Sequence, residues 1–265
     1  KKPRITDRLN HEADGRGYLP TGYSHLFVMS SEGGAIRQIS SGNYHHRGNL
    51  SWSKDNKALY FSANRTPNWE YDFRNSEVYK ISLQDGLITP LTERDGPDYS
   101  PIVSPNGKMI AYLGFDDKRE AYQNHRLYLM DCDGENKRPI SQYLDASISS
   151  IKWDADNKGI YFSFDHQGNG KIGYISLDGK VSKIADNQGG TTLGRPYSSG
   201  MFSISQNGKI AYTYTRPEHP ADIAFSDKKG ENWTRLTKLN QSLFTNKKLG
   251  KVESIWYSSS VDGRK

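Results

Sequence analysis

The sequence predicts an all-β fold, a β-propeller of four-stranded antiparallel blades, and three observations carry this prediction. A β-hairpin pattern recurs at residues 51–66, 102–117, 152–167 and 203–216. The lysines that follow its turn are 51, 50 and 51 residues apart: Lys57, Lys108, Lys158 and Lys209. No segment of these repeats shows a sustained helical period. A fixed period near 50 residues with a hairpin in each unit is typical of propellers and solenoids.

Each repeat begins with this hairpin. In residues 102–117, IVSPNGKMIAYLGFDD, two runs rich in β-formers flank a Pro-Asn-Gly turn, which is a strong hairpin signal. The second half of the repeat adds two strands separated by a polar turn. The third strands are predicted at residues 25–29, 77–82, 126–131, 171–176 and 222–226. The fourth strands are predicted at residues 36–39, 88–91, 138–140, 181–184 and 234–236. Such a sheet cannot bury both faces alone, so the blades must stack on one another.

The repeats divide the chain into blades and a C-terminal extension. The propeller spans residues 1–238, with blades at about 4–40, 48–92, 99–141, 149–185 and 200–237. In the first blade, whose hairpin diverges from the repeat, Arg4–Asn10 is a candidate inner strand. Residues 239–265 are predicted to be a linker followed by a strand at Lys251–Ser258, where apolar and polar residues alternate.

The loops differ sharply between the two faces of the predicted propeller. Tight Asn-Gly and Asp-Asn turns occupy one face. The other face carries variable loops at residues 65–75, 116–125, 165–170 and 215–221, together with the blade connections, of which 186–199 is the longest. Variable loops on a rigid scaffold are where binding residues usually lie. We therefore expect any binding surface on this second face.

Composition excludes several classes of protein. Cys132 is the only cysteine, so the fold needs no disulfide and no oxidising compartment. The net charge of +6 is scattered over turns apart from the run Lys247, Lys248 and Lys251, so we expect no nucleic-acid partner. No apolar stretch is long enough to span a membrane, and no signal peptide is visible.

No motif for catalysis or metal binding stands out. The sequence has no G-x-S-x-G, H-E-x-x-H or C-x-x-C pattern and no Gly-rich phosphate loop. His45 and His46 are adjacent, and neighbours on a strand point to opposite faces, so they are predicted to be polar loop residues rather than a chelate. The stretch Ser226–Trp233 resembles an Asp-box turn, but it lacks the aspartate and does not recur, which argues against a glycan-active propeller. No cofactor, metal ligand or catalytic residue is predicted.

Several stretches resemble the propeller of the prolyl oligopeptidase family of serine peptidases, especially its acylaminoacyl-peptidase and dipeptidyl-peptidase-like branch. The hairpin SPNGKMIAY is shared by that family and by the propeller of the periplasmic Tol system. The peptidase branch is favoured by further motifs in the family's order: DGRGY at 14–18, HLFV at 25–28, ANR at 63–65, YLGFDD at 112–117 and HPAD at 219–222.

The resemblance implies that this chain is a piece of a longer peptidase. In that family a propeller of seven or eight blades covers an α/β-hydrolase domain, which would follow residue 265 and carry the serine, aspartate and histidine. The chain would then gate the access of short or N-blocked peptides to that domain, its partner in the same polypeptide. The alternative is a Tol-type periplasmic or scaffold propeller that binds protein partners.

Four loop-face residues are candidates for contact with substrate or with the hydrolase domain: Arg65, Glu70, Arg119 and Arg126. Arginine suits a peptide carboxylate because its guanidinium donates two parallel hydrogen bonds. We further expect a cytoplasmic location, with the periplasm as the alternative. Open blade edges could also pair with a second copy, which would form a homo-oligomer.

Overall fold

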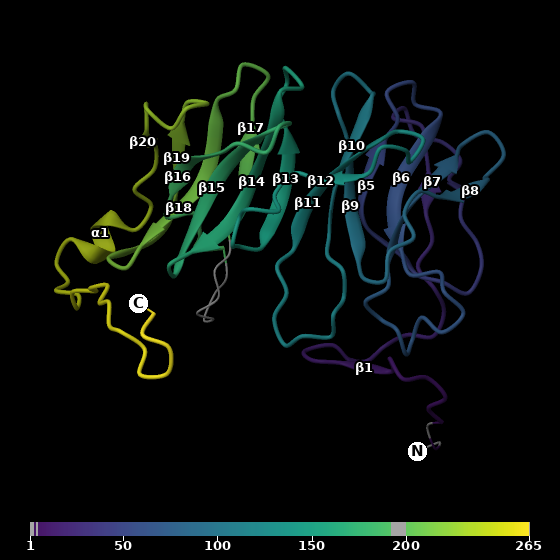
Figure 1. Ribbon diagram of the computed structural model, residues 1–265, viewed down its shortest axis with the longest axis horizontal. Helices are drawn as coiled ribbons and strands as arrows, with labels where there is room; N and C mark the ends of the chain where they lie inside the picture. Colours follow the sequence, from purple (N-terminus) through teal and green to yellow (C-terminus); the bar gives the residue numbers. More distant parts are fainter. Residues whose placement is uncertain (1–2, 4, 192–199, 265) are drawn as a thin grey trace. The chain divides into compact units, whose positions relative to one another are not determined.

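The computed structural model describes residue 3, residues 5–191 and residues 200–264 of the chain. The described part is almost entirely β-sheet (Figure 1). It contains four four-stranded antiparallel sheets, each with its strands in sequence order from one edge to the other. This confirms the propeller prediction. The chain divides into two compact units, residues 1–165 with 173–182 and residues 166–172 with 183–265.

The four complete sheets lie where the repeat predicts them. Blade two contains β5 (His46–Trp52), β6 (Ala58–Ala63), β7 (Glu77–Ser82) and β8 (Ile88–Pro90). Blade three contains β9 (Asp98–Val103), β10 (Met109–Gly114), β11 (Arg126–Asp131) and β12 (Arg138–Pro139). Blade four contains β13 (Ile148–Trp153), β14 (Gly159–His166), β15 (Asn169–Ser176) and β16 (Val181–Asp186). Blade five contains β17 (Phe202–Ile204), β18 (Ile210–Arg216), β19 (His219–Ser226) and β20 (Thr234–Arg235).

The first blade is only half of a blade. Its third and fourth strands are present as β3 (Phe27–Val28) and β4 (Arg37–Gln38), and a separate hairpin of β1 (Glu12–Ala13) and β2 (Gly17–Tyr18) precedes them. The inner strand predicted at Arg4–Asn10 is wrong for the described residues 5–10, which form no strand. Ile5 is 89% exposed and Leu9 is 53% exposed, so no apolar surface packs on this segment and fixes it as a strand.

The recurring hairpin turn is held by its serine. In blade two, the Ser53 hydroxyl accepts hydrogen bonds from the backbone N–H groups of Lys57 and Ala58, at 3.1 and 2.9 Å. In blade three, Ser104 accepts from Met109 N at 3.0 Å in the same way. Each turn also places one residue at positive φ, which only glycine and asparagine adopt readily. These residues are Asn56, Gly107, Asn157 and Gly208.

The Gly turn between the third and fourth strands packs each blade against the one before it. All four of these glycines have positive φ and face a backbone carbonyl in, or directly after, the fourth strand of the preceding blade: Gly86, Gly134, Gly179 and Gly230. A Cβ on Gly179 would lie 3.0 Å from Ile140 O, and a Cβ on Gly230 would lie 2.3 Å from Ile184 O. The repeat therefore keeps glycine here because a side chain would push neighbouring blades apart.

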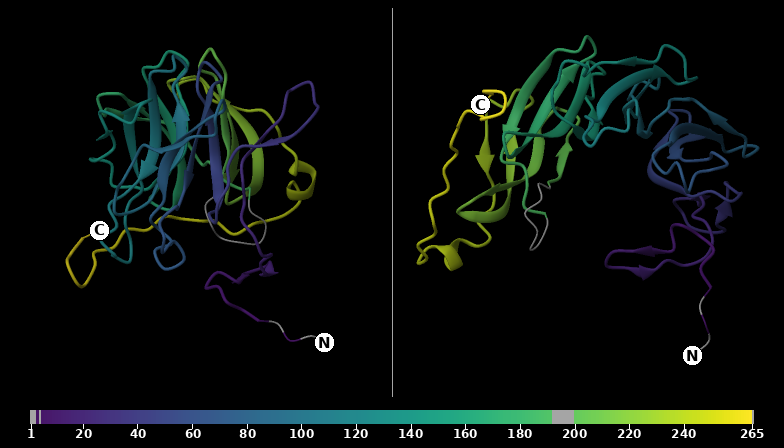
Figure 2. Two further views of the ribbon diagram at one scale, coloured as in Figure 1. Left: turned by 90° about the vertical axis from the view of Figure 1, so that its right-hand side faces the viewer. Right: turned by 60° about the horizontal axis from the view of Figure 1, so that its bottom comes forward.

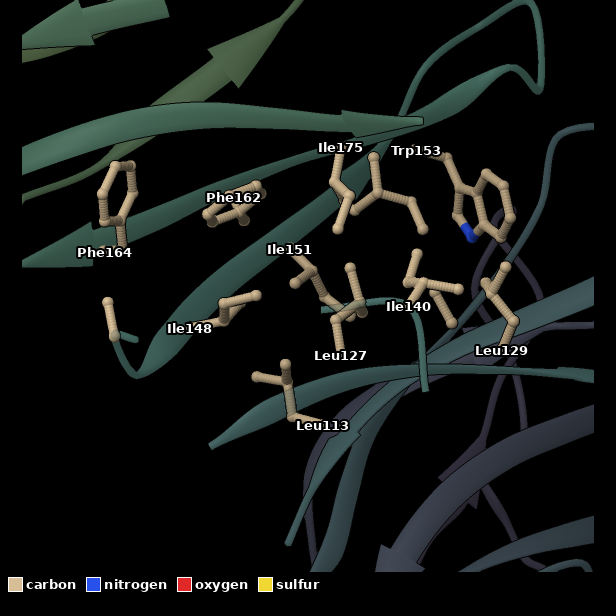
Figure 3. Close-up of a cluster of buried hydrophobic side chains, with 13 residues drawn as sticks. Leu113, Leu127, Leu129, Ile140, Ile148, Ile151, Trp153, Phe162, Phe164 and Ile175 are labelled. Carbon is tan, nitrogen blue, oxygen red and sulfur yellow. The ribbon is translucent and has the colours of Figure 1, made fainter. Parts of the chain in front are cut away.

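The largest apolar core fills the space between blades three and four (Figure 3). Leu113, Leu127 and Leu129 from blade three meet Ile148 and Phe162 from blade four in this cluster. At its edge the indole of Trp153 donates a hydrogen bond to the carbonyl of Ile102, 51 positions earlier, at 2.8 Å. This bond joins nearly equivalent positions of consecutive repeats, as radial stacking of the blades requires.

The C-terminal extension differs from its prediction. It contains one short helix, α1 (Gln241–Phe244), and the strand expected at Lys251–Ser258 is absent. Ile255 and Trp256 are 79% and 60% exposed. A strand needs a hydrogen-bonding partner, and none pairs with this segment among the described residues. The predicted connection 186–199 falls largely on residues 192–199, which lie outside the described residues.

Candidate functional site

Two loops of the first unit carry all four residues predicted from the sequence. The loop between β6 and β7 holds Arg65 and Glu70, and the loop between β10 and β11 holds Arg119, with Arg126 as the first residue of β11. Figures 1 and 2 show both loops at the same end of their sheets, the end on which the N-terminal hairpin lies. The structure separates the four residues into two regions of this face.

The first region surrounds His46, the first residue of β5. Its Nδ1 lies 3.3 Å from the carbonyl oxygen of Ser24, to which it donates. Its Nε2 then accepts from Nη1 of Arg65 at 2.5 Å. Burial lowers the pKa of His46 to about 4, and the charge of Arg65 acts in the same direction. The ring is thus neutral at neutral pH and holds Arg65 in place.

His45 is the second anchor in this region. Its Nδ1 accepts from the backbone N–H of Ser24 at 3.1 Å and from Nη2 of Arg47 at 3.0 Å. The rings of Tyr23 and Trp69 lie 5.3 and 5.5 Å from its own. Burial, followed by the charge of Arg47, lowers its pKa. The two histidines therefore do more than add polarity to a loop, because both accept hydrogen bonds from arginines. They form no metal site with other residues: the described part of the chain has no cluster of three metal-ligating side chains.

Arg8 joins the same region from the N-terminal segment. Its Nη2 donates to the hydroxyl of Tyr23 at 2.9 Å, and its guanidinium lies 4.7 Å from the centre of that ring. We name Arg8, Arg47 and Arg65 the arginine cluster. Within the described residues, no carboxylate lies within 4 Å of their guanidinium nitrogens. The sequence indicated Arg65 alone; Arg47 lies 18 positions and Arg8 lies 57 positions before it, and no repeat relates them.

Glu70 is the carboxylate that acts on this region. Its charge raises the pKa of His45, against the larger effects of burial and of Arg47. Its Oε1 is buried and accepts no hydrogen bond from any described residue. Glu70 is therefore close enough to shift the pKa of His45, but it does not neutralise the arginine cluster through an ion pair.

Arg119 and Arg126 lie in the second region, beside two adjoining grooves. A groove of about 580 Å³ is lined by Arg119 with the exposed rings of Tyr71 and Phe73. Arg119 has a positive φ of 58°, and its N–H donates to Asp117 Oδ1 at 2.8 Å. Arg126 lines a groove of about 450 Å³ and donates to the carbonyl of Gln142 at 2.7 Å. Its guanidinium thus ties two parts of blade three together at the groove wall.

A buried acidic cluster between blades two and three escaped the sequence analysis. Glu77 begins β7 and Asp98 begins β9, and the hydroxyl of Thr92 donates to Glu77 Oε2. Arg94 Nε lies 3.1 Å from Asp98 Oδ1, and Arg94 Nη1 lies 3.1 Å from Asp116 Oδ1. Burial raises the pKa of Glu77 to about 7 and that of Asp98 to about 6, the second in spite of Arg94.

A recurring serine or threonine could have revealed this cluster. In four blades, the residue that follows the last apolar residue of the fourth strand is Ser or Thr. Its hydroxyl accepts a hydrogen bond from a backbone N–H in or next to the third strand, donated by Leu26, Val78, Leu127 or Ile223. These hydroxyls belong to Ser40, Thr92, Ser141 and Thr237. The preceding third-strand position is Glu77 in blade two and Asp222 in blade five, and both contact that hydroxyl. This position is therefore a place where the fold accepts a buried acid.

Comparisons with known proteins agree with this architecture. Residues 16–119 match the family described as Dipeptidyl peptidase IV (DPP IV) N-terminal region. Dipeptidyl-peptidase 5 of Porphyromonas gingivalis is 28% identical over 144 residues, which are 52% of this chain and 21% of the relative. The uncharacterized peptidase YuxL of Bacillus subtilis is 25% identical over 276 residues, 97% of this chain and 40% of the relative. The chain therefore spans less than half the length of these relatives.

Solved structures show the same fold. An acylaminoacyl peptidase in complex with Z-Gly-Gly-Phe-chloromethyl ketone has a TM-score of 0.66 at 18% identity, over 91% of this chain and 35% of that one. TolB from Acinetobacter baumannii has a TM-score of 0.58 at 18% identity, over 80% of this chain and 48% of that one. With the relatives above, these matches confirm the resemblance to the propeller portion of a peptidase.

The described residues contain no helix of the length and apolarity that a membrane crossing requires.

Proposed function

We propose that this chain is the non-catalytic propeller portion of a serine peptidase and gates the access of short peptides to a hydrolase domain of the same polypeptide. The peptidase class rests on the curated relatives, which are peptidases by name. The gating role and the serine-type chemistry rest on the resemblance of the sequence motifs. The observation that carries the proposal is the match to a relative named as a peptidase over 97% of this chain, together with the fold shared with an acylaminoacyl peptidase over 91% of it.

The physical basis of gating is a rigid scaffold with binding loops at one end. Buried cores fix blades two and three and the part of blade four that belongs to the first unit. The loops at one end carry arginines, exposed aromatic rings and two grooves. A peptide that must pass such a face has to be short and flexible, because a folded protein presents no free extended segment. The substrate class expected is therefore short or N-blocked peptides.

Hydrolysis assays test this proposal. The 265-residue chain alone should not cleave acyl-peptide or dipeptidyl chromogenic substrates, whereas the full-length parent protein should cleave at least one of them. The same assay should show inactivation of the parent by a serine-directed inhibitor such as a fluorophosphonate. A parent that hydrolyses none of these substrates would contradict the peptidase assignment.

A Tol-type or scaffold propeller is the second candidate, and the structural likeness to TolB supports the fold that it would need. That likeness is at 18% identity and extends to fold alone. The two candidates differ in the gene beyond residue 265. A G-x-S-x-G motif there supports the peptidase, whereas its absence together with an export signal upstream supports the scaffold.

A further inference from the structure

We propose that the arginine cluster of Arg8, Arg47 and Arg65 binds the C-terminal carboxylate of short peptide substrates. This inference rests on the proposed function, because it names the group of the peptide that the loop face would hold. It goes beyond that function by assigning a binding site. It also explains how the protein could select peptides by their length, because in a short peptide the free carboxylate stays within a few residues of the bond to be cleaved.

The cluster is organised in advance for such a ligand. Arg65 is held by His46 Nε2 at 2.5 Å, Arg47 by Ser24 Oγ and His45 Nδ1 at 3.1 and 3.0 Å, and Arg8 by the hydroxyl of Tyr23 at 2.9 Å. All of these partners are neutral acceptors when the two histidines are neutral. A guanidinium has five N–H donors in a fixed plane, so each arginine keeps donors for a carboxylate while its position is fixed.

The charge of the cluster is not neutralised within the described residues. None of the three guanidinium groups has an ion-pair partner there, and Glu70 is the acid whose charge reaches His45. The three guanidinium groups thus keep their positive charge free of any direct ion pair with a described residue. Arg47 is exposed, and Arg8 and Arg65 are half-buried, so a ligand can reach all three from solvent. Charge-assisted bonds to partly desolvated arginines are stronger than bonds between neutral groups.

The surroundings favour a peptide carboxylate over a free inorganic anion. Tyr44 lies under the guanidinium of Arg65 at 5.0 Å, and Tyr23 and Trp69 flank His45. These half-buried rings offer apolar surface beside the charges, which suits the last side chain of a peptide but contributes nothing to a phosphate ion. Aromatic and arginine side chains together are also typical of the most strongly contributing residues at binding surfaces.

A matched pair of peptides tests the proposal. The full 265-residue chain is titrated with an N-acetylated tetrapeptide that has a free C-terminal carboxylate, and with the same peptide as its C-terminal amide, by calorimetry. The acid should bind about tenfold or more tightly than the amide, as expected for loss of one charged hydrogen-bonded contact. Arg65→Gln and Arg47→Gln should each remove most of this difference, and Arg65→Lys should keep part of it.

Arg37→Gln and Arg138→Gln are the matched controls, because both remove an exposed arginine whose guanidinium donates to a backbone carbonyl away from the cluster. They should leave the preference for the acid within about twofold. Equal affinity for acid and amide, or a preference lost only in the control variants, would overturn the proposal while leaving the peptidase assignment intact. Failure of both peptides to bind also overturns it, whereas the hydrolysis assays on the parent protein decide the proposed function separately. Unchanged far-ultraviolet circular dichroism of each variant excludes misfolding as the cause.

Discussion

Arginine serves two different purposes at the loop end of the first unit, and the contrast separates structure from function. In the buried acidic cluster, Arg94 lies between Asp98 and Asp116 and is neutralised. In the arginine cluster, the guanidinium groups contact only neutral acceptors and keep their charge. A buried charge must be paired because desolvation without a partner is costly. An unpaired cluster that is open to solvent carries no such requirement and is free to bind a ligand.

The largest effect is expected from breaking the paired cluster. Asp98→Ala should reduce the free energy of unfolding by about 3–5 kcal/mol at neutral pH, because it leaves Arg94 half-buried without its inner carboxylate. Asp116→Ala removes the partner on the other side of the same arginine, where the carboxylate is 74% exposed. That control should cost about 1 kcal/mol or less. Urea unfolding of the two variants compares them, and equal losses would show that burial does not decide the effect.

The pH dependence of stability should have opposite signs in the two regions. Glu77 and Asp98 have raised pKa values of about 7 and 6. Their contribution to the free energy of unfolding is fully present below the pKa values of these groups in the unfolded chain, and it falls as pH rises towards 7. His46 has its pKa lowered to about 4, so its contribution is full above about 6.5 and falls as the solution is acidified towards 4.

A variant in each region should reduce one of these two pH dependences of stability. In Glu77→Gln, the melting temperature should fall less between pH 5 and pH 8 than in the unmodified chain. In His46→Gln, the loss of melting temperature between pH 6.5 and pH 4 should become smaller. Thermal melts across this range measure both slopes. A Glu77→Gln variant that keeps the unmodified slope above pH 5 would show that this carboxyl group is ionised throughout.

Removing arginines from the cluster should change stability little. Arg47→Gln is expected to change the free energy of unfolding by no more than about 1 kcal/mol, because it removes an exposed charge and two hydrogen bonds to neutral groups. Chemical denaturation checks this value. A loss as large as that of Asp98→Ala would mean that the cluster is part of the structural core and would weaken its assignment to ligand binding.

The smallest effect is expected at Arg126. Its bond to the Gln142 carbonyl is at the exposed surface, so Arg126→Ala should change the free energy of unfolding by about 0.5 kcal/mol or less. Denaturation under the same conditions as above measures it. A larger loss would assign Arg126 to the support of the groove wall.

The sequence predicted the blades well because their determinants are local and repeated. The serine that caps three of the four hairpin turns, replaced by Asp154 in blade four, and the glycine that faces the previous blade recur at nearly fixed spacing, so the period reveals four complete sheets. The strand prediction was wrong at residues 5–10 and at Lys251–Ser258, because a favourable local sequence, such as the alternation in the second segment, does not supply a hydrogen-bonding neighbour.

The loop-face regions were predicted only in part. Arg65 and Glu70 follow from their place in a variable loop, but the partners that define the arginine cluster come from β5 and from the N-terminal segment. The proximity of Glu77 to Asp98, which raises the pKa of Glu77, depends on how blade two stacks on blade three. Such contacts join residues far apart in the chain at spacings unrelated to the repeat, so a single sequence does not reveal them.

The proposed gating role is tested most directly by the dependence of hydrolysis on peptide length. The full-length parent protein is assayed with a series of peptides from about four to forty residues that share one cleavable sequence at the same distance from the N-terminus. The account predicts that kcat/KM falls steeply as the peptide lengthens. A kcat/KM that stays constant across the series would contradict it.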